Sequence, residues 1–150
     1  MFSGRYEHAI DPKGRTSLPS RFREVLAGVD DGRVVMTTSF DPCVVVYPLG
    51  EWRAFSDRLA LQPQFDPSVI MLRRIYVSGA VECEVDKLGR VLVPQSLREH
   101  ASLTRDAIWA GMGKTIELWD KALHKAMRDA VLADPEKRDA MMSRLTELGL

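Results

Sequence analysis

Two short segments of this chain show the alternation of apolar and polar side chains that is typical of half-buried β-strands. They are residues 6–10 and 81–85, and their period of two residues is that of a strand. Each segment leads directly into a turn sequence, Asp11-Pro12-Lys13-Gly14 or Asp86-Lys87-Leu88-Gly89. Aspartate at the first position and glycine at the fourth are preferred in type I turns. We therefore predict two β-hairpins.

The same order of elements follows each hairpin turn. A short strand, residues 15–18 or 90–93, leads to Pro19 or Pro94, and proline suits the first turn of a helix because its missing N–H would be unpaired there. We predict helices over residues 19–26 and 94–100. Extended runs then follow at 33–38 and 43–47 in one copy, and at 107–110 and 115–119 in the other. Each copy thus contains strand, turn, strand, helix, strand, turn and strand.

The two hairpins belong to an internal repeat, because residues 2–24 recur without a gap at residues 77–99. Nine of the 23 aligned positions are identical, and they are turn and charge residues: Ser3, Gly4, Glu7, Asp11, Gly14, Arg15, Pro19, Arg23 and Glu24, with their counterparts. Chance rarely produces such a match. Since a copy of about fifty residues has only a marginal core by itself, we expect the two copies to share one core.

The remaining segments are predicted to be helical. Trp52, Phe55 and Leu59 mark one face of a helix after Pro48, and a second helix follows over residues 68–76. We interpret the aromatic pair as packing. The chain from residue 121 shows two amphipathic helical stretches separated at Asp134-Pro135. The predicted division is a first repeat at 1–50, a helical connector at 51–76, a second repeat at 77–124 and a helical tail at 125–150.

The charge pattern points to a local basic patch. The 150 residues are 45% hydrophobic and 28% charged, which is an ordinary soluble composition, and the formal net charge is zero. Zero net charge argues against coating nucleic acid by bulk electrostatics. Residues 1–24, however, have five basic side chains against three acidic ones: Arg5, Lys13, Arg15, Arg21 and Arg23 against Glu7, Asp11 and Glu24. We expect the first copy to face a nucleic acid and the second copy to have a mainly structural role.

The hairpin turns supply the candidate binding residues. Lys13 and Arg15 lie at the first tip, and Arg90 is the counterpart of Arg15. A guanidinium can bond a phosphate, or the O6 and N7 edge of guanine, in two places. The structural alternative is that Arg15 and Arg90 pair with Asp11 and Asp86 to brace the hairpins. The two interpretations are compatible, because a carboxylate that orients the guanidinium lowers the entropy lost on binding.

The turn aspartates and glycines are expected to be structural. Asp11 and Asp86 can close their turns by accepting hydrogen bonds from backbone N–H groups two residues on. Gly14 and Gly89 allow the chain to turn tightly.

Enzyme chemistry has little support. The three histidines, His8, His100 and His124, are far apart in the sequence, and no acid–base pair is duplicated. No phosphate-binding loop, nucleophile elbow or metal-ligand spacing occurs, and Cys43 and Cys83 stand alone. Since no signal peptide or span of about 20 apolar residues is evident, we expect a cytoplasmic protein. It should have no catalytic site, metal, cofactor, membrane contact or small-molecule substrate.

These motifs, taken together, resemble a known family. The residues that match its pattern are Met1-Phe2-x-Gly4, Asp11-x-Lys13-Gly14-Arg15, Leu18-Pro19-x-x-Phe22-Arg23, the run from Asp86 to Ala101, and Glu117-x-Trp119. The chain resembles the MraZ family of bacterial transcriptional regulators with tandem SpoVT-AbrB-type domains, over about residues 1–125. The sequence departs from the family tendency at Ser3 and Thr16.

The resemblance implies an α+β fold in which two tandem swapped-hairpin, AbrB-like halves form a double-split β-barrel pseudo-dimer with flanking helices. It also implies a ring-like homo-oligomer, associated with the nucleoid, that binds double-stranded promoter DNA at short G-rich direct repeats and represses its own division and cell-wall gene cluster. The DNA-binding role falls on Lys13 and Arg15, with Arg90 as the matching position; Arg5 is added from its charge. The alternative is an antitoxin-like protein-interaction module on the same barrel.

Overall fold

The computed structural model describes residues 1–150 and contains the element order expected for both copies. The first copy has four strands and one α-helix, with a short 3₁₀ turn that the sequence pattern did not predict: β1 (Arg5–Ala9), β2 (Arg15–Ser17), α1 (Ser20–Ala27), η1 (Asp30–Gly32), β3 (Arg33–Thr37) and β4 (Val44–Pro48). The second copy repeats the strands and the helix: β5 (Val81–Glu84), β6 (Arg90–Leu92), α4 (Gln95–His100), β7 (Asp106–Gly111) and β8 (Ile116–Asp120).

The connector and the tail are helical, as predicted. The connector comprises α2 (Leu49–Ala60), α3 (Pro67–Leu72) and a π-helical turn η2 (Arg73–Val77). The tail comprises α5 (Lys121–Ala133) and α6 (Pro135–Glu147). The chain divides into two compact units, residues 1–120 and 121–150. None of its helices has the length and apolar character that a membrane span needs.

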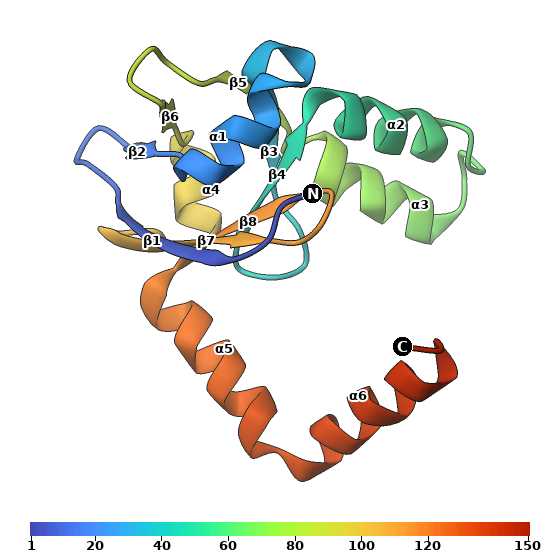
Figure 1. Ribbon diagram of the computed structural model, residues 1–150. Coiled ribbons are helices and arrows are strands. Elements are labelled where there is room, and N and C mark those ends of the chain that lie inside the picture. The colour runs from blue at the N-terminus through green and yellow to red at the C-terminus, as the bar shows by residue number, and fades with distance from the viewer. The chain divides into compact units, whose positions relative to one another are not determined.

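The strands of the two copies are exchanged. All strand pairs are antiparallel, and the six-stranded sheet has the order β1-β7-β8-β4-β3-β5. The first strand of each copy therefore pairs with the third strand of the other copy. The remaining strands, β2 and β6, form a separate two-stranded ribbon. This arrangement has an approximate two-fold relation between the copies, and it confirms the swapped-hairpin pseudo-dimer (Figure 1).

The core is shared between the copies at equivalent positions. Leu18 and Phe22 are each 1% exposed, and so is Leu97, while Val93 is completely buried; these four residues form two equivalent pairs at the repeat offset. They join one cluster with buried strand residues such as Trp109. Burial of a side chain of this size stabilises the fold by about 1.5–3 kcal/mol. The apolar positions of either copy are thus covered by the other copy.

The connector packs on the first copy through aromatic side chains. Tyr47 of β4 lies 5.4 Å from Trp52 and 5.8 Å from Phe55, measured between ring centroids. Phe55 in turn lies 5.4 Å from Tyr76 in η2. Aromatic pairs at such distances contribute about 0.5–1.5 kcal/mol beyond their buried area. The predicted packing role of Trp52 and Phe55 is therefore confirmed.

Candidate nucleic-acid interface

The first hairpin turn is organised by the carboxylate of Asp11. Its Oδ1 accepts hydrogen bonds from the backbone N–H groups of Lys13 and Arg15, both at 2.9 Å. Its Oδ2 accepts from Nε of Arg15 at 2.8 Å. Gly14 has a φ of +89°, in the left-handed region that glycine tolerates without steric cost. One aspartate therefore fixes both the turn and the orientation of the arginine that follows it.

The second hairpin repeats this arrangement. Oδ1 of Asp86 accepts from the backbone N–H groups of Leu88 at 2.9 Å and Arg90 at 2.8 Å. Oδ2 accepts from Nε of Arg90 at 3.0 Å, and Gly89 has a φ of +77°. Both ion pairs of the bracing interpretation are thus present.

These hydrogen bonds favour the charged form of both aspartates. The backbone N–H of Arg15 is the largest cause that lowers the pKa of Asp11, and its side chain adds to the effect. Arg90 lowers the pKa of Asp86 in the same way. Both carboxylates are therefore ionised at neutral pH, and each holds its guanidinium through a charge-assisted hydrogen bond.

Bracing leaves the outer part of each guanidinium accessible. The side chains of Arg15 and Arg90 are 37% and 33% exposed. Each uses Nε for the aspartate, and neither forms a hydrogen bond with another protein group through its two terminal nitrogens. Those nitrogens present N–H donors in the planar geometry that binds a phosphate or a guanine edge.

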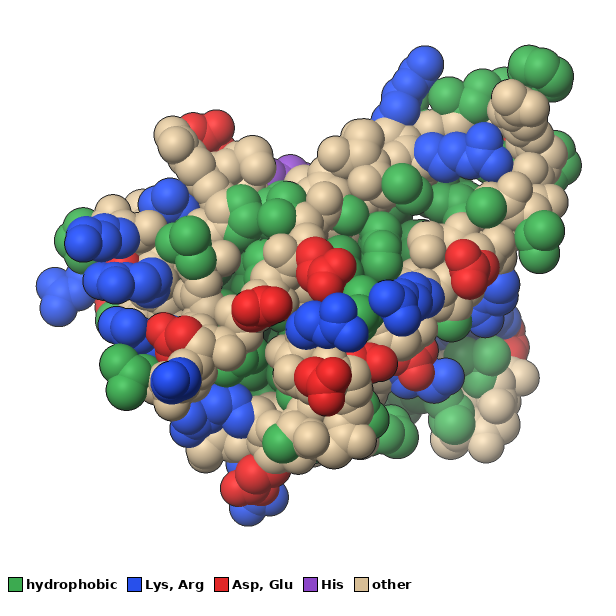
Figure 2. All heavy atoms as spheres, turned by 90° about the horizontal axis from the view of Figure 1, so that it is seen from above, with side chains coloured by type: hydrophobic (Ala, Val, Ile, Leu, Met, Phe, Trp, Pro, Cys, Tyr) green, Lys and Arg blue, Asp and Glu red, His purple; other side chains and the backbone are tan.

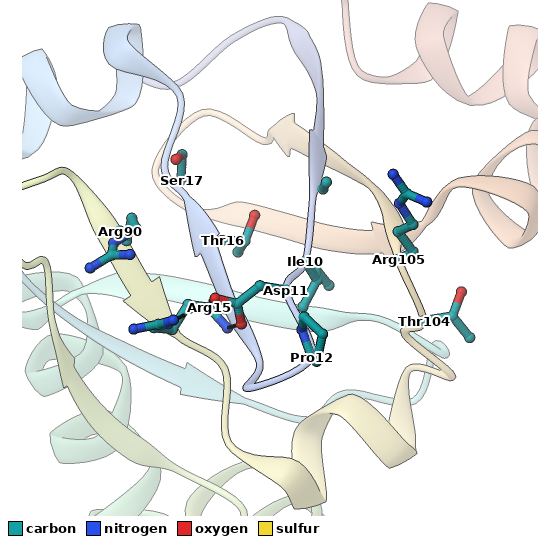
Figure 3. A pocket seen from close by; sticks show the side chains of 10 residues that line it. Ile10, Asp11, Pro12, Arg15, Thr16, Ser17, Arg90, Thr104 and Arg105 are labelled. Atoms are coloured by element: carbon teal, nitrogen blue, oxygen red, sulfur yellow. Dashed lines mark hydrogen bonds and ion pairs between the residues drawn. The ribbon is translucent and has the colours of Figure 1, made fainter.

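The strand exchange brings the two arginines onto one ribbon. In the β2–β6 pair, Arg15 lies opposite Leu92, and Arg90 lies opposite Ser17. Reciprocal backbone bonds of 2.9 Å join Leu18 to Gly89 and Val93 to Gly14. Both arginines line a pocket of about 650 Å³ beside the first hairpin (Figure 3). Residues 75 positions apart in the sequence therefore share one surface.

The structure gives a packing role to a repeated arginine that counted, from the sequence, only as part of the basic patch and of the family motif. A Cβ atom on Gly14 would lie 2.7 Å from Cζ of Arg98, and a Cβ on Gly89 would lie 2.7 Å from Cζ of Arg23. Each arginine thus packs over the turn glycine of the other copy. The repetition of this arginine four residues after Pro19 and Pro94 was visible in the sequence. Its contact was not, because each arginine reaches the glycine of the other copy.

The other candidate residues lie apart from this pair. Lys13 is exposed at the tip of the first turn. Arg5 is exposed and lies opposite Ala110 at the start of β1. Ala9, at the other end of β1, lines the pocket, and the rise of an antiparallel strand places Arg5 about 14 Å from Ala9. Arg5 does not line the pocket that Arg15 and Arg90 share. Hence the structure brings together Arg15 and Arg90, with Lys13 nearby in the chain.

Cationic side chains gather at the edge that has the hairpin turns. The turns that follow β1 and β5 lie at the left of Figure 1, and Lys and Arg side chains cluster at the left edge of Figure 2, with few acidic groups among them. A local positive surface of this kind attracts polyanions although the net charge of the chain is zero.

Other titratable groups do not form a reactive centre. Burial, and then the charge of Arg23, lowers the pKa of His8. Burial raises the pKa of the Cys43 thiol to about 12 and that of Cys83 to about 11. Both cysteines are therefore protonated at neutral pH, which is the unreactive form.

Fold and site together define a duplicated swapped-hairpin protein that presents braced arginines on a basic edge. The family described as "MraZ protein, putative antitoxin-like" matches residues 1–75 and 76–143, a division that coincides with the internal repeat. The chain belongs to the MraZ family.

Individual relatives match most of the chain. A protein of Desulfitobacterium hafniense is 44% identical over 123 residues, which cover 82% of this chain and 83% of the relative. A protein of Heliobacterium modesticaldum is 45% identical over 121 residues, which cover 81% of this chain and 82% of the relative. One of a Marinomonas species is 38% identical over the whole of both chains. All three are named "Transcriptional regulator MraZ", a name that does not describe a class of enzyme.

Proposed function

We propose that this protein is a sequence-specific DNA-binding transcriptional regulator. In this proposal it represses its own division and cell-wall gene cluster from the nucleoid, by binding short direct repeats in the promoter. The names of the relatives support regulation of transcription. The observation that supports DNA as the ligand is the pair of braced arginines, whose terminal nitrogens form no hydrogen bond with another protein group.

The braced geometry suits recognition of bases. Because Asp11 already restricts the Arg15 side chain, contact with DNA costs less conformational entropy than it would for a freely moving arginine. A guanidinium with free terminal nitrogens can bond O6 and N7 of guanine, and a good bidentate contact contributes about 1–3 kcal/mol of discrimination. We assign this role to Arg15, and phosphate contacts to Lys13 and Arg90.

We include assembly into a ring-like homo-oligomer in this proposal for a physical reason. A few cationic contacts from one neutral chain bind DNA weakly at cellular salt, because each contact contributes through counterion release. Several identical hairpin edges on one homo-oligomer, facing repeated boxes, increase the effective concentration of each edge without any new contact.

The decisive experiment is a fluorescence-anisotropy titration with the duplex upstream of the gene, over a range of salt concentrations. We expect log K to fall linearly with log salt, by about 0.9 for each neutralised phosphate. Arg15→Ala should remove the preference for the upstream duplex over a scrambled one. The control is Arg58→Ala, which removes an exposed arginine of α2 that forms no ion pair.

An antitoxin-like interaction module remains the second candidate. A specific observation favours it: a groove of about 840 Å³ between α2 and α3 is lined partly by Phe65, which is 85% exposed. Salt-insensitive binding, or equal binding of upstream and scrambled duplexes by the unmodified protein, would favour this module over the regulator.

A further inference from the structure

Arg105 lies beside the first hairpin although it comes from the other copy. The backbone N–H of Ile10 donates to the carbonyl of Arg105 at 2.7 Å, which holds the residue next to the end of β1 as the chain enters β7. The Arg105 side chain is exposed and forms no ion pair. Together with Arg15 and Arg90 it lines the pocket of about 650 Å³.

The three arginines occupy both flanks of the hairpin. In Figure 3, Arg15 and Arg90 lie on one side of the β1–β2 hairpin, and Arg105 lies on the other side, beyond β1. The only acidic residue that lines this pocket is Asp11, and its oxygens already accept hydrogen bonds from Lys13 and Arg15. The lining residues therefore have a formal excess of two positive charges; Arg90 is paired with Asp86 outside the lining, and Arg105 has no paired carboxylate.

The corresponding surface of the second hairpin lacks this excess. The strand register pairs Ala9 with Asp106 and Glu84 with Arg33, so Gly32 occupies the position that corresponds to Arg105. The residues of the second hairpin that correspond to the lining of the first pocket include three basic ones, Lys87, Arg90 and Arg15, and three acidic ones, Glu84, Asp86 and Asp31. Their formal charge is zero, so the asymmetry distinguishes the first hairpin as the anion-binding one.

We propose that Arg105 binds a phosphate of the DNA backbone on the flank of the first hairpin opposite Arg15 and Arg90. This inference rests on the proposed function and adds a contact to it. The major groove is about 12 Å wide and is bordered by both phosphate backbones. A hairpin that enters it with cations on both flanks faces one backbone on each side, and phosphate contacts fix the orientation of a protein on the duplex.

The structure distinguishes the role of Arg105 from that of Arg15. Arg15 is held by a carboxylate, which suits directional bonding to a base edge, whereas Arg105 has no such brace. An exposed, unbraced guanidinium can adapt to a phosphate oxygen, a contact that contains no direct sequence information. Loss of Arg105 should therefore weaken binding to every duplex by a similar factor.

The test is Arg105→Gln in the full chain, titrated with the upstream duplex and a scrambled duplex at several salt concentrations. We expect weaker binding to both duplexes, an unchanged affinity ratio between them, and a salt slope that is smaller by about 0.9 for each site. Arg105→Lys, which keeps the charge, should retain the slope. Arg58→Gln, the matched loss of an exposed arginine on α2, should leave affinity and slope unchanged.

Each other outcome has a definite meaning. If the unmodified protein binds the upstream duplex with a salt-dependent preference, but Arg105→Gln has the same affinity and slope, the Arg105 contact is refuted while the proposed function stands. If Arg105→Gln removes the preference for the upstream duplex, the residue reads bases and the phosphate assignment is wrong. Failure of the unmodified protein to prefer that duplex would refute the proposed function itself. Circular dichroism and thermal melting show whether the variant is folded.

Discussion

The sharpest prediction on stability concerns Thr16, whose hydroxyl is buried without a hydrogen-bond partner. Its side chain is 2% exposed in β2, and Oγ1 has no partner in the structure. The equivalent residue of the second copy is Val91, which lies directly opposite Thr16 in the β2–β6 pair and belongs to the core. Valine has nearly the same shape as threonine but no group that loses hydration on burial.

We therefore expect Thr16→Val to stabilise the protein. An unsatisfied buried polar group costs about 1–3 kcal/mol, and the substitution removes that cost without changing the packed volume. In a chain of this length, 1 kcal/mol corresponds to roughly 2–4 °C in Tm. The mirror substitution Val91→Thr, at a position that is 1% exposed, should lower the free energy of unfolding by a similar amount.

Thr37 provides the matched control. It is also fully buried, but its Oγ1 donates to the carbonyl of Tyr76 at 2.5 Å and links β3 to η2. Thr37→Val should thus destabilise the protein by about 0.5–1.5 kcal/mol, the contribution of a typical hydrogen bond. Urea unfolding followed by circular dichroism measures all three variants, and the midpoints should shift without a change in the m-value. If Thr16→Val lowers the midpoint as Thr37→Val does, the hydroxyl has a partner and the reasoning is refuted.

Two further predictions concern the hairpin turns. Gly89→Ala should lower Tm more than Gly32→Ala. Both glycines have a positive φ, but a Cβ atom added at Gly89 would meet the Arg23 side chain, whereas nothing lies within 4 Å of a Cβ added at Gly32. Equal losses of Tm in thermal melting would show that the contact with Arg23 contributes nothing. Asp11→Asn should lower Tm at neutral pH, and its difference from the unmodified protein should shrink as the pH falls below 3.8. The sign follows because the pKa of Asp11 is lowered in the folded state, so its stabilisation is present above the ordinary pKa and is lost on protonation; a difference that stays constant in melting curves down to low pH would contradict it.

The local elements of both copies were predictable from the sequence. Alternation with a period of two residues, followed by aspartate and glycine at fixed turn positions, specifies a hairpin through short-range sterics and hydrogen bonding. Pro19 and Pro94 mark the helix starts for a similarly local reason, although each lies at the N-cap, one residue before α1 or α4, and not in the first turn as predicted. The bracing of Arg15 by Asp11 was also accessible, since the two residues are four positions apart.

The strand exchange was accessible only through family resemblance. A strand that pairs within its own copy and one that pairs with the other copy have the same alternation, because the pattern specifies which face is buried and not which neighbour supplies the hydrogen bonds. The sequence could not show that the Thr16 hydroxyl is buried without a partner for the same reason, since only the packed core shows whether a threonine hydroxyl can reach an acceptor.

The sequence by itself determined that this protein is duplicated, because a repeat is read directly from residue identities, and that each copy has a hairpin, because a hairpin turn depends on contacts within a few residues. It offered the bracing of Arg15 and Arg90 as one interpretation, which the structure bears out. Only the tertiary structure decided that β2 pairs with β6, which places Arg15 and Arg90 on one ribbon. It alone placed Arg105 on the opposite flank of the first hairpin and Arg23 over Gly89. Those contacts join residues more than sixty positions apart, and such pairings depend on how the whole core closes.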